Sequence, residues 1–134
     1  MTVAHSRMQQ LVDQFKDHIE GELVNDVERT LKTLTDDIVY EHPFRDDYSA
    51  NMKGIDEVRH YYQTEWAKHP FRTIEVLRSW PCTDDTVAVE VYANVEVEGK
   101  IVGSKALCFG TFRDGLLCKE VVFNGPLVPV TRSN

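Results

Sequence analysis

The sequence predicts an α+β domain in which a curved antiparallel sheet and about three helices enclose an internal pocket. In the first half of the chain, apolar residues recur every three or four positions, which is typical of helices. In the second half, apolar and polar residues alternate, which is typical of strands with one buried face. With 134 residues, 42% of them hydrophobic and 28% charged, the chain has the size and composition of a single domain, residues 1–134.

Three helices are expected before the strand-rich half begins. Their periodic segments are residues 6–22, 27–34 and 55–66. Asn25 or Asp26 can cap the second helix, because a short polar side chain there accepts a hydrogen bond from the first-turn backbone. Residues 35–37 then interrupt the pattern, and Asp36-Asp37 is expected to form a solvated loop between helix and strand. Pro70 is expected to end the third helix.

The expected strands are residues 38–42, 71–80 and 86–97, followed by a terminal hairpin. Residues 98–99 read as a two-residue turn, because the glycine there can adopt a left-handed conformation. This turn sets Val89 opposite Cys108. Val91 then lies opposite Ala106, and the alternating valines share one inward face.

The turn around Asp114-Gly115 leaves two registers open for the last strand. A two-residue turn puts Cys108 on the face of Lys119, Val121 and Phe123. A three-residue turn with Gly115 left-handed pairs Cys108 with Glu120 and adds to that face Cys118, Val122 and Asn124. We favour the three-residue turn, because it collects on the outer face an apolar set suited to a homodimer interface: Leu107, Phe109, Leu117, Val121 and Phe123.

Charge and composition argue against several classes of partner. The net charge is −7 and the basic residues are scattered singly, which argues against nucleic-acid binding. No apolar run approaches the ~20 residues that span a bilayer, and no signal-peptide stretch opens the chain, so we expect no membrane partner and a cytoplasmic location. Three cysteines without CxxC spacing favour free thiols, and no spacing indicates a metal or another cofactor.

Three segments carry a resemblance to a known family: residues 36–44 (DDIVYEHPF), 54–62 (GIDEVRHYY) and 112–117 (FRDGLL). The chain resembles the NTF2-like (cystatin-like) superfamily, in particular its SnoaL-like and ketosteroid-isomerase-like members, from about Phe15 to Pro126. The resemblance implies a cone-shaped fold, in which the sheet curls around the helices and leaves a deep pocket with one open end.

The resemblance can be followed residue by residue at four positions. Ketosteroid isomerases have an aspartate base just before the proline of the first strand, where this chain has His42. Their two oxyanion donors, a tyrosine and an aspartic acid, fall on His18 and Cys108. Their pocket tyrosine on the third helix is matched by Tyr62. Three of the four positions differ, so the resemblance implies the fold and leaves the reaction open.

Three residues are candidates for acid–base chemistry. His42, at a strand end facing the pocket, can take a proton near neutral pH; alternatively, loop groups such as Asp46 satisfy it. Glu120 points inward in the favoured register and could orient His42 or act as a second acid or base; in the other register it is a solvated edge charge. His18 could donate a hydrogen bond into the cavity, or lie at the helix surface near Glu22.

The expected pocket lining combines aromatic, small apolar and amide side chains. Tyrosine hydroxyls could orient a ligand carbonyl, whereas the thiol is a weak donor that is expected to pack as a small apolar group. The predicted substrate-binding residues are Tyr40, Tyr62, Trp66, Cys108, Val89, Val91 and Asn124.

Two functions from different classes fit these residues. The first is a cofactor-free enzyme that transfers a proton beside the carbonyl of a small apolar or polyketide-like compound, as an isomerase, cyclase or dehydratase does. His42 would be the base, and Tyr40, Tyr62 or His18 would donate to the oxyanion. The second is a module that binds a small ligand or dimerises without chemistry.

Overall fold

The structure is a computed structural model that describes residues 2–69 and 71–130; Pro70, expected to end the third helix, lies outside them. The helices are α1 (Thr2–Leu23), α2 (Val27–Leu31) and α3 (Ile55–Tyr61), with a 3-10 turn η1 (Tyr48–Ala50) and a π-helical turn η2 (Tyr62–Trp66). The strands are β1 (Leu34–Glu41), β2 (Asn51–Lys53), β3 (Phe71–Pro81), β4 (Thr86–Val97), β5 (Lys100–Arg113), β6 (Leu116–Asn124) and β7 (Val128–Pro129).

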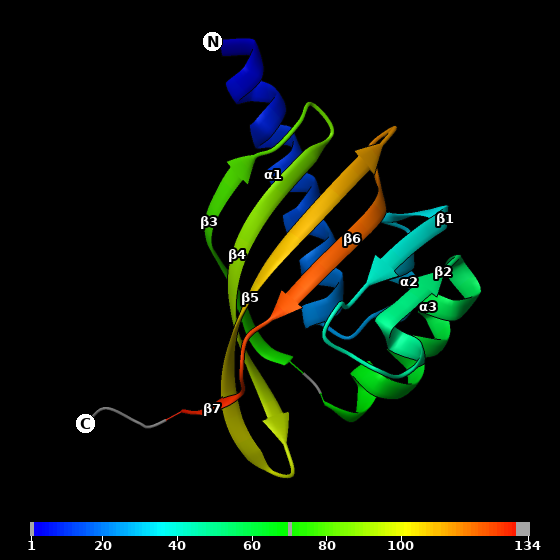
Figure 1. Cartoon of the computed structure of the whole chain (residues 1–134), viewed down its shortest axis with the longest axis vertical. Coiled ribbons are helices and arrows are strands. Elements are labelled where there is room, and N and C mark those ends of the chain that lie inside the picture. Colours follow the sequence, from blue (N-terminus) through cyan, green and yellow to red (C-terminus); the bar gives the residue numbers. More distant parts are fainter. Residues whose placement is uncertain (1, 70, 131–134) are drawn as a thin grey trace.

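Within the described residues the strands form one curved, open sheet in the order β2-β1-β6-β5-β4-β3, with β7 beside β5. In Figure 1, α1 crosses one face of this sheet, while α2 and α3 lie near β1 and β2. The predicted α+β cone is confirmed. The sheet is mixed rather than antiparallel throughout, because β1 and β6 run parallel. This pairing is possible because most of the chain lies between the two strands and supplies the long connection that parallel neighbours need.

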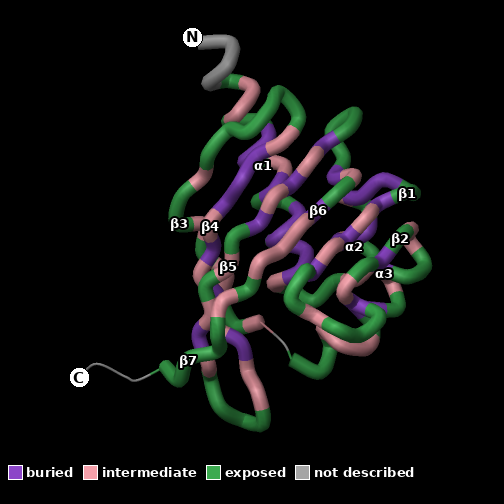
Figure 2. The backbone as a smooth tube through the Cα atoms, in the orientation of Figure 1, coloured by how far each residue is buried: buried purple, intermediate pink, exposed green. Residues whose placement is uncertain are grey.

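The inner face of the sheet packs on α1. Leu11 and Phe15 lie one helical turn apart on the buried side of α1 and are 1% and 2% exposed. Figure 2 shows buried residues along both α1 and β4. A glycine is required where helix and sheet approach most closely, because a Cβ at Gly110 would lie 2.4 Å from the Phe15 ring. The predicted apolar stripe of the first helix therefore packs against the inner face of the sheet.

The second helix is shorter than predicted, and the first strand begins earlier. Asp26 caps α2 by accepting a hydrogen bond from the Arg29 backbone, and the helix ends at Leu31. The Thr33 carbonyl then accepts a hydrogen bond from the Leu117 backbone at 2.8 Å. This contact with β6 extends β1 back to Leu34, so the loop expected at Asp36-Asp37 was wrong, although both side chains are exposed as expected.

The last hairpin has a two-residue turn, so the predicted three-residue turn was wrong. Asp114 and Gly115 both have positive φ angles, 53° and 81°, which suit the turn that matches strand twist. Thr111 pairs with Lys119 and Phe112 with Leu117, which leaves Cys118 without a partner on β5. Cys118 is therefore a one-residue bulge, and it shifts the register of β6 by one.

Because of the bulge, the residues on the inner face of β6 are nearly those that the sequence predicted. Glu120 pairs with Gly110, whereas Cys108 pairs with Val122 and not with Glu120 as predicted. Glu120 is 7% exposed on the inner face. Leu117 was placed on the outer face by the sequence, but it is fully buried, because it precedes the bulge.

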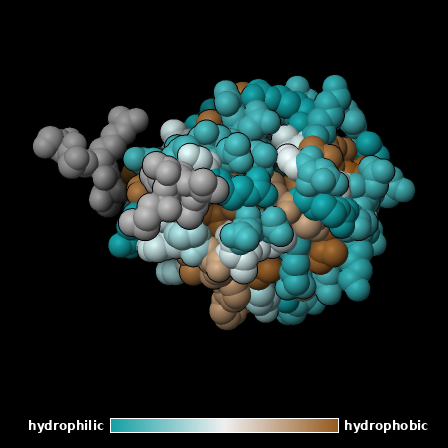
Figure 3. Space-filling model, turned by 90° about the horizontal axis from the view of Figure 1, so that it is seen from above, coloured by the Kyte–Doolittle hydropathy of each residue, from teal (hydrophilic) through white to brown (hydrophobic). Residues whose placement is uncertain are grey.

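The outer face of β5 and β6 keeps four of the five apolar residues proposed for a dimer interface. Leu107 is exposed, and Phe109, Val121 and Phe123 are half-buried. The homodimer stays a prediction. Seen from above, the molecule is mostly hydrophilic with separate hydrophobic areas (Figure 3). In the described part of the chain, no helix is long and apolar enough to cross a membrane.

Candidate active site

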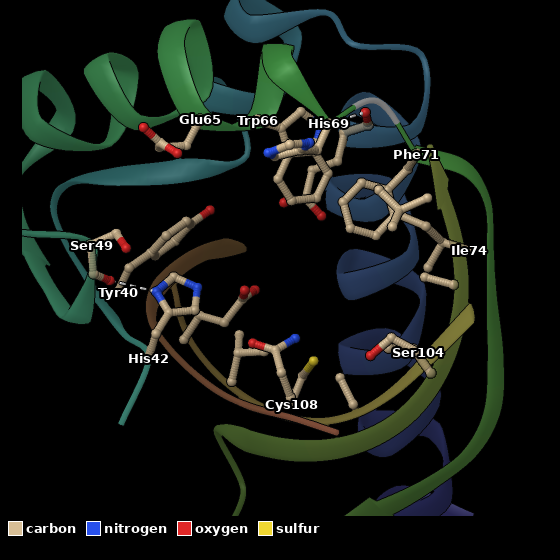
Figure 4. Close-up of a pocket in the computed structure, with 18 of the residues that line it drawn as sticks. Tyr40, His42, Ser49, Glu65, Trp66, His69, Phe71, Ile74, Ser104 and Cys108 are labelled. Carbon is tan, nitrogen blue, oxygen red and sulfur yellow. Dashed lines mark hydrogen bonds between the residues drawn. The ribbon is translucent and has the colours of Figure 1, made fainter. Parts of the chain in front are cut away.

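A cavity of about 610 Å³ lies between the inner face of the sheet and the helices. Its sheet wall is formed by small apolar side chains of β4, among them Val91, Ala93 and Val95. Trp66 of η2 and Phe71 at the start of β3 stack at a ring separation of 4.3 Å and also line the cavity. Figure 4 shows these two rings facing the same hollow as His42 and Cys108. Such a mainly apolar cavity with few polar groups is typical of small-molecule sites.

His42 follows β1, and its ring lies at the edge of the hollow (Figure 4). The Nδ1–H group donates to the Ser49 carbonyl at 2.7 Å, so that the neutral ring keeps the Nε2 lone pair free. Burial, reinforced by the charge of Arg45, lowers the pKa of His42 to about 4. His42 is therefore neutral at pH 7 but a weaker base than an ordinary imidazole. The loop partner that sequence reasoning offered, Asp46, is replaced by the Ser49 carbonyl.

We expect His42 to cause acid destabilisation. Because its folded pKa of about 4 lies below the ordinary 6.5, the unfolded chain binds a proton first as the pH falls. Stability should therefore drop between pH 6.5 and 4, by roughly 3 kcal/mol at most. His42→Asn keeps an N–H group for the Ser49 carbonyl but does not titrate, so urea unfolding should show a flatter pH dependence. His60→Asn, at an exposed position of α3, is the control, and parallel curves for His42→Asn and the parent would contradict this account.

Glu120 reaches the cavity from β6 and lies beside His18, not beside His42. Its Oε2 atom is 3.6 Å from His18 Nε2 and has no hydrogen-bond partner among the described residues. Glu120 lies across the β1–β6 ladder from Tyr40, a long-range pairing that the sequence pattern does not reveal. Burial raises the pKa of Glu120 to about 7; nearby His18 opposes this rise and Glu22 adds to it. The predicted pairing of Glu120 with His42 was wrong.

His18 is completely buried, which excludes the surface position that sequence reasoning favoured. Its Nδ1 atom lies 2.7 Å from Thr33 Oγ1, and its Nε2 atom lies 3.1 Å from the Tyr40 hydroxyl. Glu22 Oε2 is 3.5 Å from the same Nε2 atom. Burial disfavours the charged ring, but the carboxylates of Glu22 and Glu120, with a smaller contribution from Asp17, outweigh it and raise the pKa of His18.

Tyr40 and Tyr62 are hydrogen-bonded to each other, and each has a second buried partner, His18 for Tyr40 and Glu22 for Tyr62. Their hydroxyl oxygens are 2.7 Å apart, and the Tyr62 hydroxyl donates to Glu22 Oε2 at 2.6 Å. Burial raises the pKa of both tyrosines well above the ordinary value, so both hydroxyls stay protonated. Because their protons are already engaged, they stabilise the polar cluster rather than offering free donors to a ligand.

Of the remaining predicted substrate-binding residues, some line the cavity and one lies in the core. Cys108, Val91 and Asn124 line the cavity together with Trp66, whose indole N–H donates to the Glu22 backbone carbonyl. Burial and the neighbouring Glu120 raise the pKa of the Cys108 thiol well above its usual range, which suits packing rather than nucleophilic attack. Val89, like His18, lies behind the lining in the core.

Sequence reasoning missed Glu22 and underrated the loop before η1. Glu22 falls on the buried stripe of α1, one turn after His18 and two turns after Phe15, and this spacing was the available signal. Arg45 and Asp47 also line the cavity near Ser49. Arg45 donates to Ser49 Oγ and to the Tyr61 hydroxyl. Among the described residues, no group of three His, Cys, Asp or Glu side chains is arranged to hold a metal.

A comparison with models of known protein families gives a match. A family model described as the SnoaL-like domain matches residues 13–120, which include the second half of α1, the strand before His42 and the β6 strand up to Glu120. The chain belongs to the SnoaL-like family. None of the curated proteins matches this SnoaL-like chain significantly.

Solved structures share the fold of the SnoaL-like chain at low identity. The Δ5-3-ketosteroid isomerase from Mycobacterium sp. superposes with a TM-score of 0.74 at 15% identity, over 85% of this chain and 92% of the isomerase. An LEH-like epoxide hydrolase from Mycobacterium tuberculosis gives 0.74 at 13% identity, over 88% and 84%. A Mycobacterium tuberculosis protein in complex with estradiol-17beta-hemisuccinate gives 0.75 at 16% identity, over 85% and 92%. At such identities the likeness shows the fold alone.

Proposed function

We propose that this SnoaL-like protein is a cofactor-independent enzyme that moves a proton beside the carbonyl of a small apolar or polyketide-like compound. The reaction is of the isomerase, cyclase or dehydratase type. One observation carries the proposal: the Glu120 carboxyl is buried at the wall of an apolar cavity, with an unpartnered oxygen and a pKa of about 7. A carboxyl tuned to the working pH can both accept and return a proton, which makes it an effective general acid–base.

The proposed roles differ from the sequence expectation in two respects: Glu120 and His42 exchange roles, and Tyr40 and Tyr62, whose hydroxyl protons are engaged, are not the free donors expected. Glu120 is the proton acceptor, because a pKa of about 7 makes it a stronger base than His42, whose pKa is about 4. His42 orients the ligand, since its free Nε2 atom can accept a hydrogen bond while Nδ1–H is held by Ser49. The valine-rich wall excludes water and so strengthens both interactions.

The structural neighbours support a small, rigid and largely apolar ligand. One is described as a ketosteroid isomerase, one as an epoxide hydrolase, and one was solved with a steroid derivative. A cavity of about 610 Å³ is within the range of drug-sized ligand sites. The second candidate, a module that binds such a ligand without changing it, fits the same cavity.

The deciding experiment follows proton exchange rather than a complete reaction. The protein is incubated in D₂O with a Δ5-3-ketosteroid and with an aromatic β-keto ester, and deuterium at the α-carbon is measured by mass spectrometry. Binding is read independently from Trp66 fluorescence in a Trp80→Phe background, because Trp66 lines the cavity and Trp80 does not. Exchange above the buffer rate supports the enzyme. Compounds that quench Trp66 but never exchange would establish the binding module instead.

A further inference from the structure

A continuous chain of hydrogen bonds runs from Glu22 through the buried cluster to the backbone of α2. Its links in order are Glu22–Tyr62 at 2.6 Å, Tyr62–Tyr40 at 2.7 Å, Tyr40–His18 at 3.1 Å, His18–Thr33 at 2.7 Å and Thr33–Thr30 carbonyl at 2.6 Å. The direction of the hydrogen bond at the Thr30 end is fixed, because a carbonyl oxygen can only accept a proton. Thr33 therefore donates to Thr30, and His18 Nδ1 must donate to Thr33.

Counting protons along this chain gives an imbalance of one. The five links need five protons, whereas the two tyrosine hydroxyls, the Thr33 hydroxyl and His18 Nδ1–H supply four. The missing proton is at Tyr40. Its hydroxyl has one proton but lies at hydrogen-bond distance from two acceptors, the Tyr62 oxygen and His18 Nε2. If the chain lacked the fifth proton, two buried acceptors would face each other at hydrogen-bond distance, at a cost.

We infer that one additional proton is shared along Glu22, Tyr62, Tyr40 and His18, which makes Glu22 a second acid–base group of the cavity. In one arrangement the proton is on His18 Nε2, and every hydroxyl donates toward an ionised Glu22. In the other it is on the Glu22 carboxyl, every hydroxyl donates the opposite way, and His18 Nε2 is the final acceptor. Passing a proton across each of the three links converts one arrangement into the other.

The surroundings of His18 favour retention of that proton. Two carboxyl oxygens lie on either side of its Nε2 atom, Glu22 Oε2 at 3.5 Å and Glu120 Oε2 at 3.6 Å. The groups around the ring are Glu22 on α1, Tyr40 on β1, Thr33 before β1 and Glu120 on β6, and the mostly exposed Asp17 acts on the ring only through its charge. No cation is among them, so the positive charge of the imidazolium is opposed only by its burial. The raised pKa of His18 agrees with this charge balance.

The shared proton gives the proposed reaction a return path, and this consequence rests on the proposed function. Glu120 takes a proton from the substrate carbon, and the Glu22 carboxyl gives its proton to a second atom of the substrate. In this arrangement His18 Nε2 carries no proton, so the donation leaves the chain one proton short and His18 neutral. Glu120 supplies the missing proton to His18 Nε2 when their 3.6 Å separation closes to hydrogen-bond distance, below about 3.2 Å. Passing a proton from His18 to Tyr40, from Tyr40 to Tyr62 and from Tyr62 to Glu22 then returns the Glu22 carboxyl to its starting state. No proton is gained or lost overall, and both carboxyls line the cavity.

The proton count can be tested by NMR without a substrate. In protein labelled with ¹⁵N-histidine and with ¹³C at the glutamate carboxyls, the His18 and Glu22 signals are followed from pH 5 to 9. We expect His18 Nδ1 to be protonated throughout, and the extra proton to leave at one pH that both the His18 Nε2 and Glu22 signals report, because coupled groups titrate together. In Tyr40→Phe and in Tyr62→Phe the hydroxyl chain is cut and only the direct 3.5 Å contact of Glu22 Oε2 with His18 Nε2 remains, so the pH values at which the two signals change should move apart relative to the parent.

Tyr61→Phe is the matched control, because Tyr61 is a neighbouring buried tyrosine that bonds Arg45 instead of the chain. The two signals should still titrate together in this variant. A singly protonated His18 beside an ionised Glu22 at neutral pH would overturn the inference, and so would titration of the two signals that is unchanged from the parent in both chain variants. Absence of α-proton exchange together with shared titration would count against the proposed reaction only, so the two failures are distinguishable.

Discussion

Glu120→Gln should slow α-proton exchange by at least ~100-fold on any carbonyl compound that the parent protein exchanges, because positioned proton transfer contributes about that much. Gln keeps the shape and the hydrogen-bonding oxygen of the side chain but does not accept a proton at neutral pH. Binding, read from Trp66, should be little changed, since the cavity keeps its volume. The measurement is deuterium incorporation at saturating ligand for the parent and the variant.

The pH profile separates a base from a merely structural residue. Because the base must be ionised, the exchange rate of the parent should rise as the pH passes the Glu120 pKa of about 7 and then level off. The Glu120→Gln variant should lose this step along with the rate. Glu41→Gln is the control, since Glu41 follows Tyr40 on the opposite side of β1 and contacts Lys119. A Glu120→Gln variant that keeps the rate and the pH step would remove Glu120 from the mechanism.

His18→Leu should destabilise the fold by about 3–5 kcal/mol at pH 7, which is the usual effect of removing one partner of a buried ion pair. Leucine fills a similar volume, so the loss comes from Glu22 and Glu120, whose buried carboxyls no longer face a cation. A carboxyl whose folded pKa is raised loses stability as the pH climbs above its unfolded value of about 4.3. The penalty should therefore be smaller at pH 5 than at pH 7. Urea unfolding at the two pH values measures it.

A second substitution tests the cause of that penalty. In the His18→Leu background, Glu120→Gln removes one of the two uncompensated carboxyls and should recover part of the lost stability at pH 7. The same change in the parent should recover less, because His18 is still present to oppose the charge. An equal penalty at both pH values would point to packing around Phe15 and Tyr40 instead of charge.

Sequence reasoning reached most of the fold because its strongest signals are local. Strict alternation in β4 and a two-residue turn at residues 98–99 are enough to set Val89 opposite Cys108, as the structure shows. The register of the last hairpin was harder to predict. A three-residue turn without a bulge and a two-residue turn with a bulge at Cys118 both direct Glu120 inward, so the alternation alone does not choose between them.

The site was predictable as a set of side chains but not as a network. His42, Tyr40, Tyr62 and Glu120 were all expected at the cavity, because each follows from strand parity or from the family resemblance. Their partners depend on contacts between distant segments. Glu120 meets His18 only because β6 pairs in parallel with β1 and α1 packs on that part of the sheet. Glu22 was overlooked since a glutamate on a helix is usually solvated.

The unpaired Cys118 decides which face of β6 the ligand meets. If Cys118 paired with Thr111 in a regular ladder, each later residue of the strand would move to the opposite face. The lysine at 119 and the phenylalanine at 123 would then face the interior, and the acid at 120 would face outward. Whether this one residue pairs or bulges thus determines whether the chamber is acidic or basic and aromatic, while the turn and the first strand stay as they are.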